Sequence, residues 1–339
     1  MAVNIGLVAT LAELEDWYKG QRDGIGDTLE LLNKTNDVLA DIPWMEANGS
    51  DGHKTRMRTG LPTVYYRRLY RGTPVSKSQW SQVKETCSML EARQELDVKE
   101  VELYGDKAKA FRMSEAKAFM ESLRQKVART LFYGAQDASP DEFNGLSIRY
   151  SDPSSKHVIS AGSDSPAGNC SMWLVRWGSD TVHGIYPKGS KGGVSHKDLG
   201  TYTTTDSDGG SNKFEVVADL YSWDVGLAVR DWRAVARICN IDSSKLMLRK
   251  GVSGWIDLQK YTLMAKNALP EGMRSGAVWY CNSDVMTALE LQAGDSGNVH
   301  LRYGEYFNLK EVPFLHGIPV RQCDALISAE ELVTPPAAA

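Results

Sequence analysis

Hydrophobic residues at the start of the chain follow the period of an α-helix. The first apolar stripe contains Leu7, Leu11, Leu14 and Tyr18, which are four, three and four residues apart. A second stripe runs from Ile25 to Leu39, and Pro43 is expected to end that helix. Because an apolar stripe has to be buried, we expect both helices to pack against the chain's own core or against a neighbouring subunit.

Two more helical patterns follow, over residues 80–90 and 114–133. The apolar stripe of the first is Trp80, Val83, Cys87 and Leu90. That of the second is Ala116, Met120, Leu123 and Val127. Ser114 suits the N-cap of the second helix, and Gly134 is placed to end it. We therefore predict two amphipathic helices in succession.

From residue 145 to residue 255 the pattern changes to that of β-strands. Short runs rich in β-branched and aromatic residues alternate there with turn-rich stretches. The predicted strands cover residues 172–177, 181–186, 201–205, 214–221 and 225–238. The stretch 187–213 is rich in Gly, Ser, Asp and Lys, which predicts an exposed loop or the tip of a hairpin.

The last third of the chain mixes both patterns. Helices are predicted over residues 255–269 and 285–292, with a strand over 275–281 between them. Two strands, 312–315 and 318–322, come before the C-terminal tail. The pattern as a whole predicts an α+β fold.

The composition is that of a globular protein. Of the 339 residues, 42% are hydrophobic and 24% are charged, and the formal net charge is −4. These values exclude the disordered class and a basic field over the whole chain. The first residues lack a signal-peptide pattern, and no apolar run reaches the roughly 18 residues of a membrane span. We therefore expect a soluble, cytoplasmic product.

The sequence contains no recognised catalytic or metal-binding motif. The five cysteines are scattered without a C-x-x-C pair, which favours reduced, buried thiols over a disulfide framework or a zinc site. The six histidines lack the spacing of a metal-binding face, and both the G-x-S-x-G elbow and the phosphate-binding P-loop are missing. We predict no catalytic residue, cofactor or metal, although an enzyme of an unrecognised family would give the same negative result.

Charge is distributed unevenly near the start of the chain. Residues 1–50 hold nine Asp or Glu against three Lys or Arg, a balance of −6, whereas residues 51–75 hold six basic residues against Asp51, a balance of +5. The basic segment contains two extended runs, 53–59 and 63–70, which predict a long hairpin. The opposite charges suggest that the two segments meet within or between subunits. A solvated basic surface or a nucleic-acid patch is the alternative.

Two stretches resemble the major capsid proteins of tailed bacteriophages. The first is the helix from Ser114 together with LFYGAQDASPDEFNGL, which is similar to the family's long spine helix, its bulky-apolar-then-Gly step, a polar loop and a Gly-Leu pair. The residues at these positions are Leu131, Phe132, Gly134, Pro140, Phe143, Gly145 and Leu146. The second stretch, FLHGIPVRQCDAL, is similar to the family's closing strand, with its Gly-apolar-Pro-Val at residues 317–320.

The resemblance implies the Hong Kong 97-type capsid fold, an α+β fold with an N-terminal arm, a long β-hairpin loop, a peripheral domain with a spine helix, and an axial domain. The implied parts are the arm 1–42, the hairpin loop 43–75, the peripheral domain 76–150 with the spine helix 114–133, a β-rich insertion 151–213, the axial domain 214–310, C-terminal strands 311–330 returning to the peripheral domain, and the tail 331–339. The insertion departs from a minimal version of this fold.

The function implied by the resemblance is that of a major capsid protein. Such a protein self-assembles into the pentamers and hexamers of an icosahedral head that encloses double-stranded DNA and contacts it non-specifically. A scaffolding protein is an expected partner, and a decoration protein is a candidate partner. No membrane is involved. The virion is expected to be assembled in the host bacterial cytoplasm. The residues expected to contact other subunits are Arg56, Arg58, Tyr65, Arg67, Arg68, Arg71, Leu11 and Leu14. The alternatives are another phage virion protein or a soluble enzyme.

Overall fold

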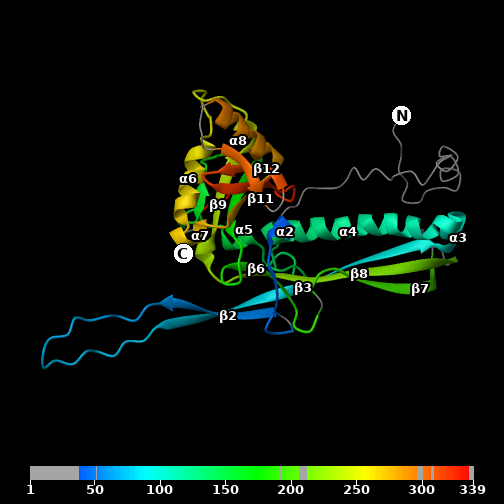
Figure 1. The fold of residues 1–339 in the computed structure, drawn as a ribbon, viewed down its shortest axis with the longest axis horizontal. Helices are drawn as coiled ribbons and strands as arrows, with labels where there is room; N and C mark the ends of the chain where they lie inside the picture. The colour runs from blue at the N-terminus through cyan, green and yellow to red at the C-terminus, as the bar shows by residue number, and fades with distance from the viewer. Residues whose placement is uncertain are drawn as a thin grey trace. The chain divides into compact units, whose positions relative to one another are not determined.

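The computed structural model describes residues 38–50, 52–190, 192–205, 212–295, 301–306 and 309–335. These residues belong to two compact units. Among the described residues, the smaller unit contains 94–120, 198–205 and 212–219, and the larger unit contains the others. Figure 1 labels the helices and strands.

One sheet has six strands in the order β1-β6-β8-β3-β2, with β7 also paired to β8. Its strands are β1 (Trp44–Glu46), β2 (Gly52–Gly60), β3 (Gln79–Asp97), β6 (Val182–Tyr186), β7 (Ser195–Thr205) and β8 (Lys213–Val229). Strands β2 and β3 form an antiparallel hairpin, with Gly52 opposite Thr86 at one end and Gly60 opposite Gln79 at the other.

The second sheet has seven strands in the order β11-β12-β13-β10-β5-β9-β4. Its strands are β4 (Val158–Ser160), β5 (Asn169–Arg176), β9 (Val235–Asp242), β10 (Ala277–Cys281), β11 (Leu301–Tyr306), β12 (Leu309–Leu315) and β13 (Ile318–Gln322). Strand β5 is buried on both faces: Met172 and Leu174 point into one hydrophobic core, and Trp173 and Val175 point into the other.

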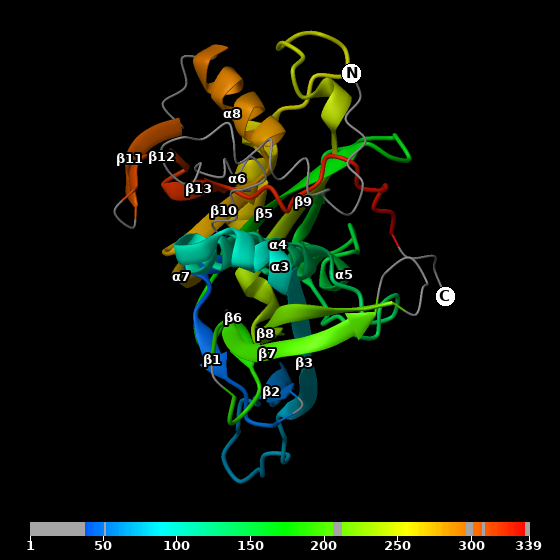
Figure 2. The ribbon, with the colours of Figure 1, turned by 90° about the vertical axis from the view of Figure 1, so that its right-hand side faces the viewer.

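Helices pack on both faces of this seven-stranded sheet. The helices of the described residues are α2 (Val38–Asp41), α3 (Val98–Leu103), α4 (Ala108–Tyr133), α5 (Leu146–Arg149), α6 (Leu258–Ala268), α7 (Glu271–Arg274) and α8 (Ser283–Asp295), and not all of them contact this sheet. The 3-10 turns are η1 (Gly105–Lys107), η2 (Trp232–Ala234) and η3 (Ser243–Lys245). Helices α6 and α8 contribute to the core that contains Met172 and Leu174. Figures 1 and 2 show both helices beside the strands of this sheet. The end of α4 contributes Leu131 and Phe132 to the other core.

Most predicted elements of the second half are confirmed. Strands β5, β6, β10, β12 and β13 and helices α6 and α8 all lie within a few residues of the expected ranges. The strand predicted over 225–238 is interrupted by η2, so its two ends belong to β8 and β9 in different sheets. The stretch 187–213, predicted as an exposed loop or the tip of a hairpin, contains the exposed strand β7, and its residues 191 and 206–211 lie outside the described residues.

The predicted helix over residues 80–90 is wrong, because these residues belong to strand β3. Gln, Lys, Glu, Met and Leu favour a helix locally, but hydrogen bonding to β2 on one side and β8 on the other fixes this segment as a strand. The extended run 63–70 is not a strand either; it lies in the loop between β2 and β3. Helix α4 contains the predicted helix 114–133 but begins at Ala108, so Ser114 is not its N-cap.

The strands of residues 151–213 are shared between the two sheets, with β4 and β5 in the seven-stranded sheet and β6 and β7 in the six-stranded one. The division of the chain into arm, hairpin loop, peripheral domain, insertion and axial domain stays a prediction. The helix predicted over Leu7–Tyr18 lies outside the described residues, and α2 covers only the end of the second predicted stripe.

Candidate assembly surfaces

The hairpin of β2 and β3 carries a long exposed loop, residues 61–78, which projects beyond the ends of both strands (Figure 1). Six large apolar residues in this loop are at least 81% exposed: Leu61, Val64, Tyr66, Leu69, Tyr70 and Val75. Single exposed apolar residues are ordinary on a protein surface, but six of them within one loop are typical of a contact surface.

Local contacts shape the loop without covering it. The Arg71 amide donates to the Arg68 carbonyl over 3.2 Å, and the Arg67 Nε–H donates to the Arg71 carbonyl over 3.0 Å. Tyr70 adopts the left-handed backbone region with φ 63°, which is uncommon for a residue with a side chain. Ser76 Oγ donates to the Thr63 carbonyl over 2.8 Å and joins the two sides of the loop. The loop therefore has a defined turn at its tip.

The structure places six of the eight candidate contact residues on the hairpin. Arg56 and Arg58 are exposed on β2, and the Arg58 guanidinium lies 4.5 Å from the ring centroid of Trp80. Tyr65, Arg67, Arg68 and Arg71 are exposed in the loop. Leu11 and Leu14 lie outside the described residues. None of the six large exposed apolar residues of the loop is among the contact residues predicted from the sequence, and only their large exposed fraction points to them.

The opposite end of the hairpin, here called the hairpin root (residues 52–55 of β2 and 83–86 of β3), is fixed by a buried ion pair. Glu85 accepts two hydrogen bonds of 2.6 Å from the guanidinium of Arg149 on α5. Arg149 also donates to the Asn144 carbonyl over 3.2 Å. Gly52, which is opposite Thr86, must be a glycine, because a Cβ at this position would lie 2.0 Å from the carbonyl oxygen of the neighbouring Glu85. The hairpin root is thus anchored to α5, and the loop is presented from this anchored base.

The first stretch that resembles the capsid proteins is a close-packed turn after α4. A Cβ at Gly134 would lie 2.3 Å from the Phe143 carbonyl oxygen, and one at Gly145 would lie 2.6 Å from the Thr130 carbonyl oxygen. The Gly145 amide donates to the Gly134 carbonyl over 2.9 Å, and Leu146 is fully buried. Both glycines are therefore required by close approach of the backbone.

The second stretch ties the C-terminal strands to α2. Arg321 on β13 pairs with Asp41, and the Tyr280 hydroxyl donates to the other oxygen of Asp41 over 2.6 Å. Asp41 and Arg321 are both nearly completely buried. This pair ties α2, at the start of the described residues, to β13.

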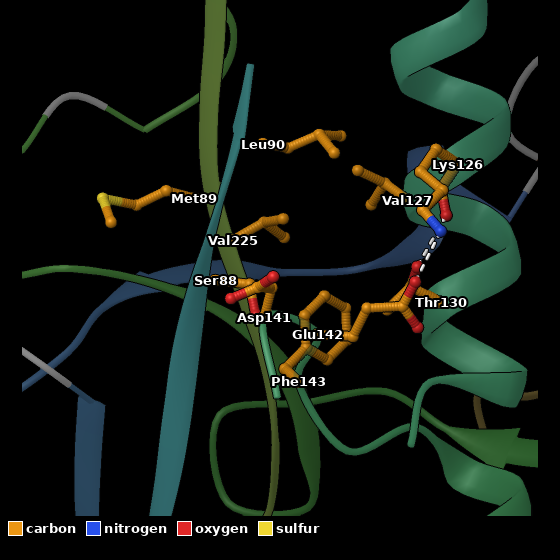
Figure 3. Close-up of a pocket in the computed structure, with 10 residues that line it drawn as sticks. All are labelled: Ser88, Met89, Leu90, Lys126, Val127, Thr130, Asp141, Glu142, Phe143 and Val225. Atoms are coloured by element: carbon orange, nitrogen blue, oxygen red, sulfur yellow. Dashed lines mark hydrogen bonds and ion pairs between the residues drawn. The ribbon is translucent and has the colours of Figure 1, made fainter. Parts of the chain in front are cut away.

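A recess lies between α4, β3 and the loop that follows α4 (Figure 3). It contains ≈ 280 Å³ of empty space, part of it open to solvent. Its lining is mostly apolar and includes Leu90, Val127 and Phe143. Three charged residues also line it: Asp141, Lys126 and Glu142. Lys126 and Glu142 form an ion pair of 2.5 Å, so these two groups are occupied with each other.

No group of three or more potential metal ligands occurs among the described residues. Four of the five cysteines are buried, and burial raises the pKa of Cys170 to about 12 and that of Cys239 to about 11. These thiols are therefore protonated at neutral pH and poorly reactive. In the ranges that the structure describes, none of the helices has the length and apolar character needed to cross a bilayer.

Comparison with known proteins identifies the family. The family model of major capsid protein GP7 matches residues 20–334. A chain from the near-atomic-resolution structure of bacteriophage Epsilon15 is 31% identical, with 98% of this chain and 99% of that chain covered and a TM-score of 0.73. A chain of the Mycobacterium phage Bobi structure is 10% identical, with 68% and 97% covered and a TM-score of 0.44. No curated protein matches.

The family model and the Epsilon15 chain confirm the predicted relationship to phage major capsid proteins and the predicted α+β capsid fold of the Hong Kong 97 type. With the family model matching nearly the whole sequence, this chain belongs to the major capsid protein GP7 family.

Proposed function

We propose that this protein builds an icosahedral phage head from pentamers and hexamers and that the loop 61–78 supplies an essential contact between subunits. The observation that carries the proposal is the set of six exposed apolar side chains in the loop 61–78, on a hairpin whose root is anchored by the pair Glu85–Arg149. No other described part of the chain covers this set.

Burial of these side chains against a neighbouring copy would supply a large favourable free energy. Each large apolar side chain contributes about 1.5–3 kcal/mol when it is fully buried, so six give on the order of 10 kcal/mol before the entropic cost of association. Contacts of this kind are heterologous, because the loop meets a different surface, and such contacts close into rings. A loop that reaches across to a neighbour is therefore suited to pentamers and hexamers.

The charges of the loop support a partner surface that is acidic. Arg67, Arg68 and Arg71 are exposed, and the chain has an acidic balance of −6 over residues 1–50. We propose that the arm 1–42 extends along another subunit. The basic loop of one copy then meets the acidic segment of another copy, and Leu11 and Leu14 are candidate contacts of the arm. Opposite charges at such a rim guide association and fix its register.

The remaining parts of the proposal concern partners and location. The head encloses double-stranded DNA and contacts it non-specifically, and a net charge of −4 fits a wall that does not hold DNA tightly. A separate scaffolding protein directs assembly in the host bacterial cytoplasm, and a decoration protein is a candidate partner. The protein has no catalytic activity and needs no cofactor.

Electron microscopy of the purified full chain, with sedimentation velocity on the same sample, tests this proposal. We expect shells, tubes or rings of five or six subunits. A compact monomer or dimer that persists in crowding agents would contradict it.

A further inference from the structure

Two buried histidines lie at the hairpin root. His53 is on β2 and His183 is on β6. Their rings meet edge to face, with centroids 5.8 Å apart and planes at 89°. His183 is completely buried and His53 is 9% exposed. Strands β2 and β6 are not hydrogen-bonded neighbours in the sheet, so the two rings form a side-chain contact between the hairpin root and a strand beyond it.

Most polar atoms of this pair are buried without a hydrogen-bond partner. These atoms are Nδ1 of His53 and both ring nitrogens of His183, whose interaction with the main chain of Gly178 falls outside normal hydrogen-bond geometry. Thr55 is two residues along β2 and on the same face as His53. Its Oγ1 is also buried without a hydrogen-bond partner. Buried polar groups are almost always satisfied, and apolar side chains would fill this space at lower free energy. Such a concentration of unsatisfied groups at one point indicates a role other than packing.

The charged groups around the pair oppose proton uptake. Arg230, at the end of β8, disfavours the protonated form of both rings. Glu85 lies opposite His53 across the hairpin and favours protonation, but both of its oxygens bind Arg149. Asp180 and the main chain of Gly178, in the turn before β6, favour protonation of His183, and the neighbouring His53 disfavours it. Burial is the largest effect for both rings.

We propose that His53 and His183 form an acid-sensitive hinge: neutral rings pack the hairpin root against β6, and proton uptake opens this packing. The opening would change how the hairpin is held, whether or not the loop 61–78 contacts another copy. The inference therefore goes beyond the proposed assembly role and does not depend on it.

The direction of the pH dependence follows from the pKa values. Burial and Arg230 lower the pKa of His53 below its usual value, and they lower that of His183 to about 4. A ring released by opening regains an ordinary pKa near ~6.5. The open form therefore binds more protons below that pH. The closed hinge is fully favoured above about pH 6.5 and is weakened progressively as the pH falls toward about 4.

Amide hydrogen exchange of the full chain, read by mass spectrometry between pH 7.5 and pH 4.5 and corrected for the intrinsic pH dependence, tests the hinge. We expect peptides of the hairpin root to lose protection by about tenfold or more, while peptides of β5 change by less than about twofold. Unchanged protection at the hairpin root would overturn the proposal. An equal loss at β5 would also overturn it, because that result means acid unfolding of the whole unit.

Variants assign the effect to the two rings. The double substitution His53→Phe with His183→Phe should reduce the pH effect at the hairpin root to less than about twofold. His196→Phe, at an exposed position on β7, is the matched control and should keep the wild-type profile. A double variant that keeps the full pH effect would contradict the assignment. If that variant does not fold, His53→Phe alone must reduce the effect. Failure of assembly at neutral pH would contradict the proposed function and leave these exchange results unaffected.

Discussion

The two ends of the β2–β3 hairpin differ sharply in their surroundings. At the hairpin root, Glu85 and Arg149 form a buried ion pair with two hydrogen bonds, and the side chain of Glu85 is 7% exposed. In the loop 61–78, Tyr66 and Tyr70 are fully exposed. The hairpin root thus contributes to the stability of the subunit, whereas the loop at the opposite end of the hairpin is exposed and can contact other copies. Substitutions at the two ends should therefore affect different measurements.

Glu85→Ala should have the largest effect on stability. It leaves the Arg149 guanidinium buried without its carboxylate, which costs about 3–5 kcal/mol. Urea unfolding of unassembled subunits measures this loss. Replacing both partners, Glu85→Met with Arg149→Met, should cost far less, because no buried charge is left. If the double variant were as unstable as the single one, the ion pair would not be the cause.

Polar substitution of the loop should affect assembly and spare the fold. In the combined variant Leu61→Ser, Val64→Ser, Leu69→Ser and Val75→Ser, we expect the free energy of unfolding to change by less than about 1 kcal/mol, because the side chains are already exposed. Sedimentation velocity should show loss of shells. Met247→Ser with Val252→Ser, at half-exposed positions outside the hairpin, is the control. Normal shells from the loop variant would remove the loop from the interface.

Arginine substitution in the loop should have an intermediate effect. Exposed ion pairs contribute about 0–1 kcal/mol each and weaken with salt. We expect shells to form only at a higher protein concentration when Arg67→Gln, Arg68→Gln and Arg71→Gln are combined. This threshold concentration should also depend less on salt than in the wild type, and light scattering measures both changes. Replacing the same residues by Lys should preserve the salt dependence. Wild-type assembly that is insensitive to salt would exclude an electrostatic contact.

Trp80→Ala should have the smallest effect, a loss of about 0.5–1 kcal/mol in the free energy of unfolding, because its contact with the Arg58 guanidinium is partly exposed. Thermal or urea unfolding measures this change. Arg58→Lys keeps a cation over the ring and should retain most of the stability. A loss of more than about 2 kcal/mol would mean that the contact stabilises more of the hairpin than its exposure indicates.

The elements predicted correctly from the sequence are those whose local hydrophobic pattern agrees with their tertiary surroundings. Strand β5 is a short run of apolar residues and is buried on both faces, as expected of a central strand. The end of α4 at Tyr133 follows from Gly134, which close backbone approach requires. These predictions succeeded because local and long-range preferences coincide.

Strand β3 could not be predicted in this way. Its local composition favours a helix, and only pairing with β2 and β8, which are distant in the sequence, makes it a strand. The partners Glu85 and Arg149 are 64 residues apart, and no local signal connects them. The basic character of the loop 61–78 was visible in the sequence, but the exposure of its apolar residues depends on where the hairpin ladder ends, at Gly60 and Gln79.

The most direct test of the central claim is to shorten the hairpin and observe whether shells form. Gly60 and Gln79 are opposite each other, so residues 61–78 can be replaced by Asn-Gly, which closes a two-residue hairpin turn. Electron microscopy beside the wild-type chain should show no shells from the shortened chain, whereas urea unfolding should show an intact subunit. Shells of normal size and number from the shortened chain would contradict the assembly role of the loop.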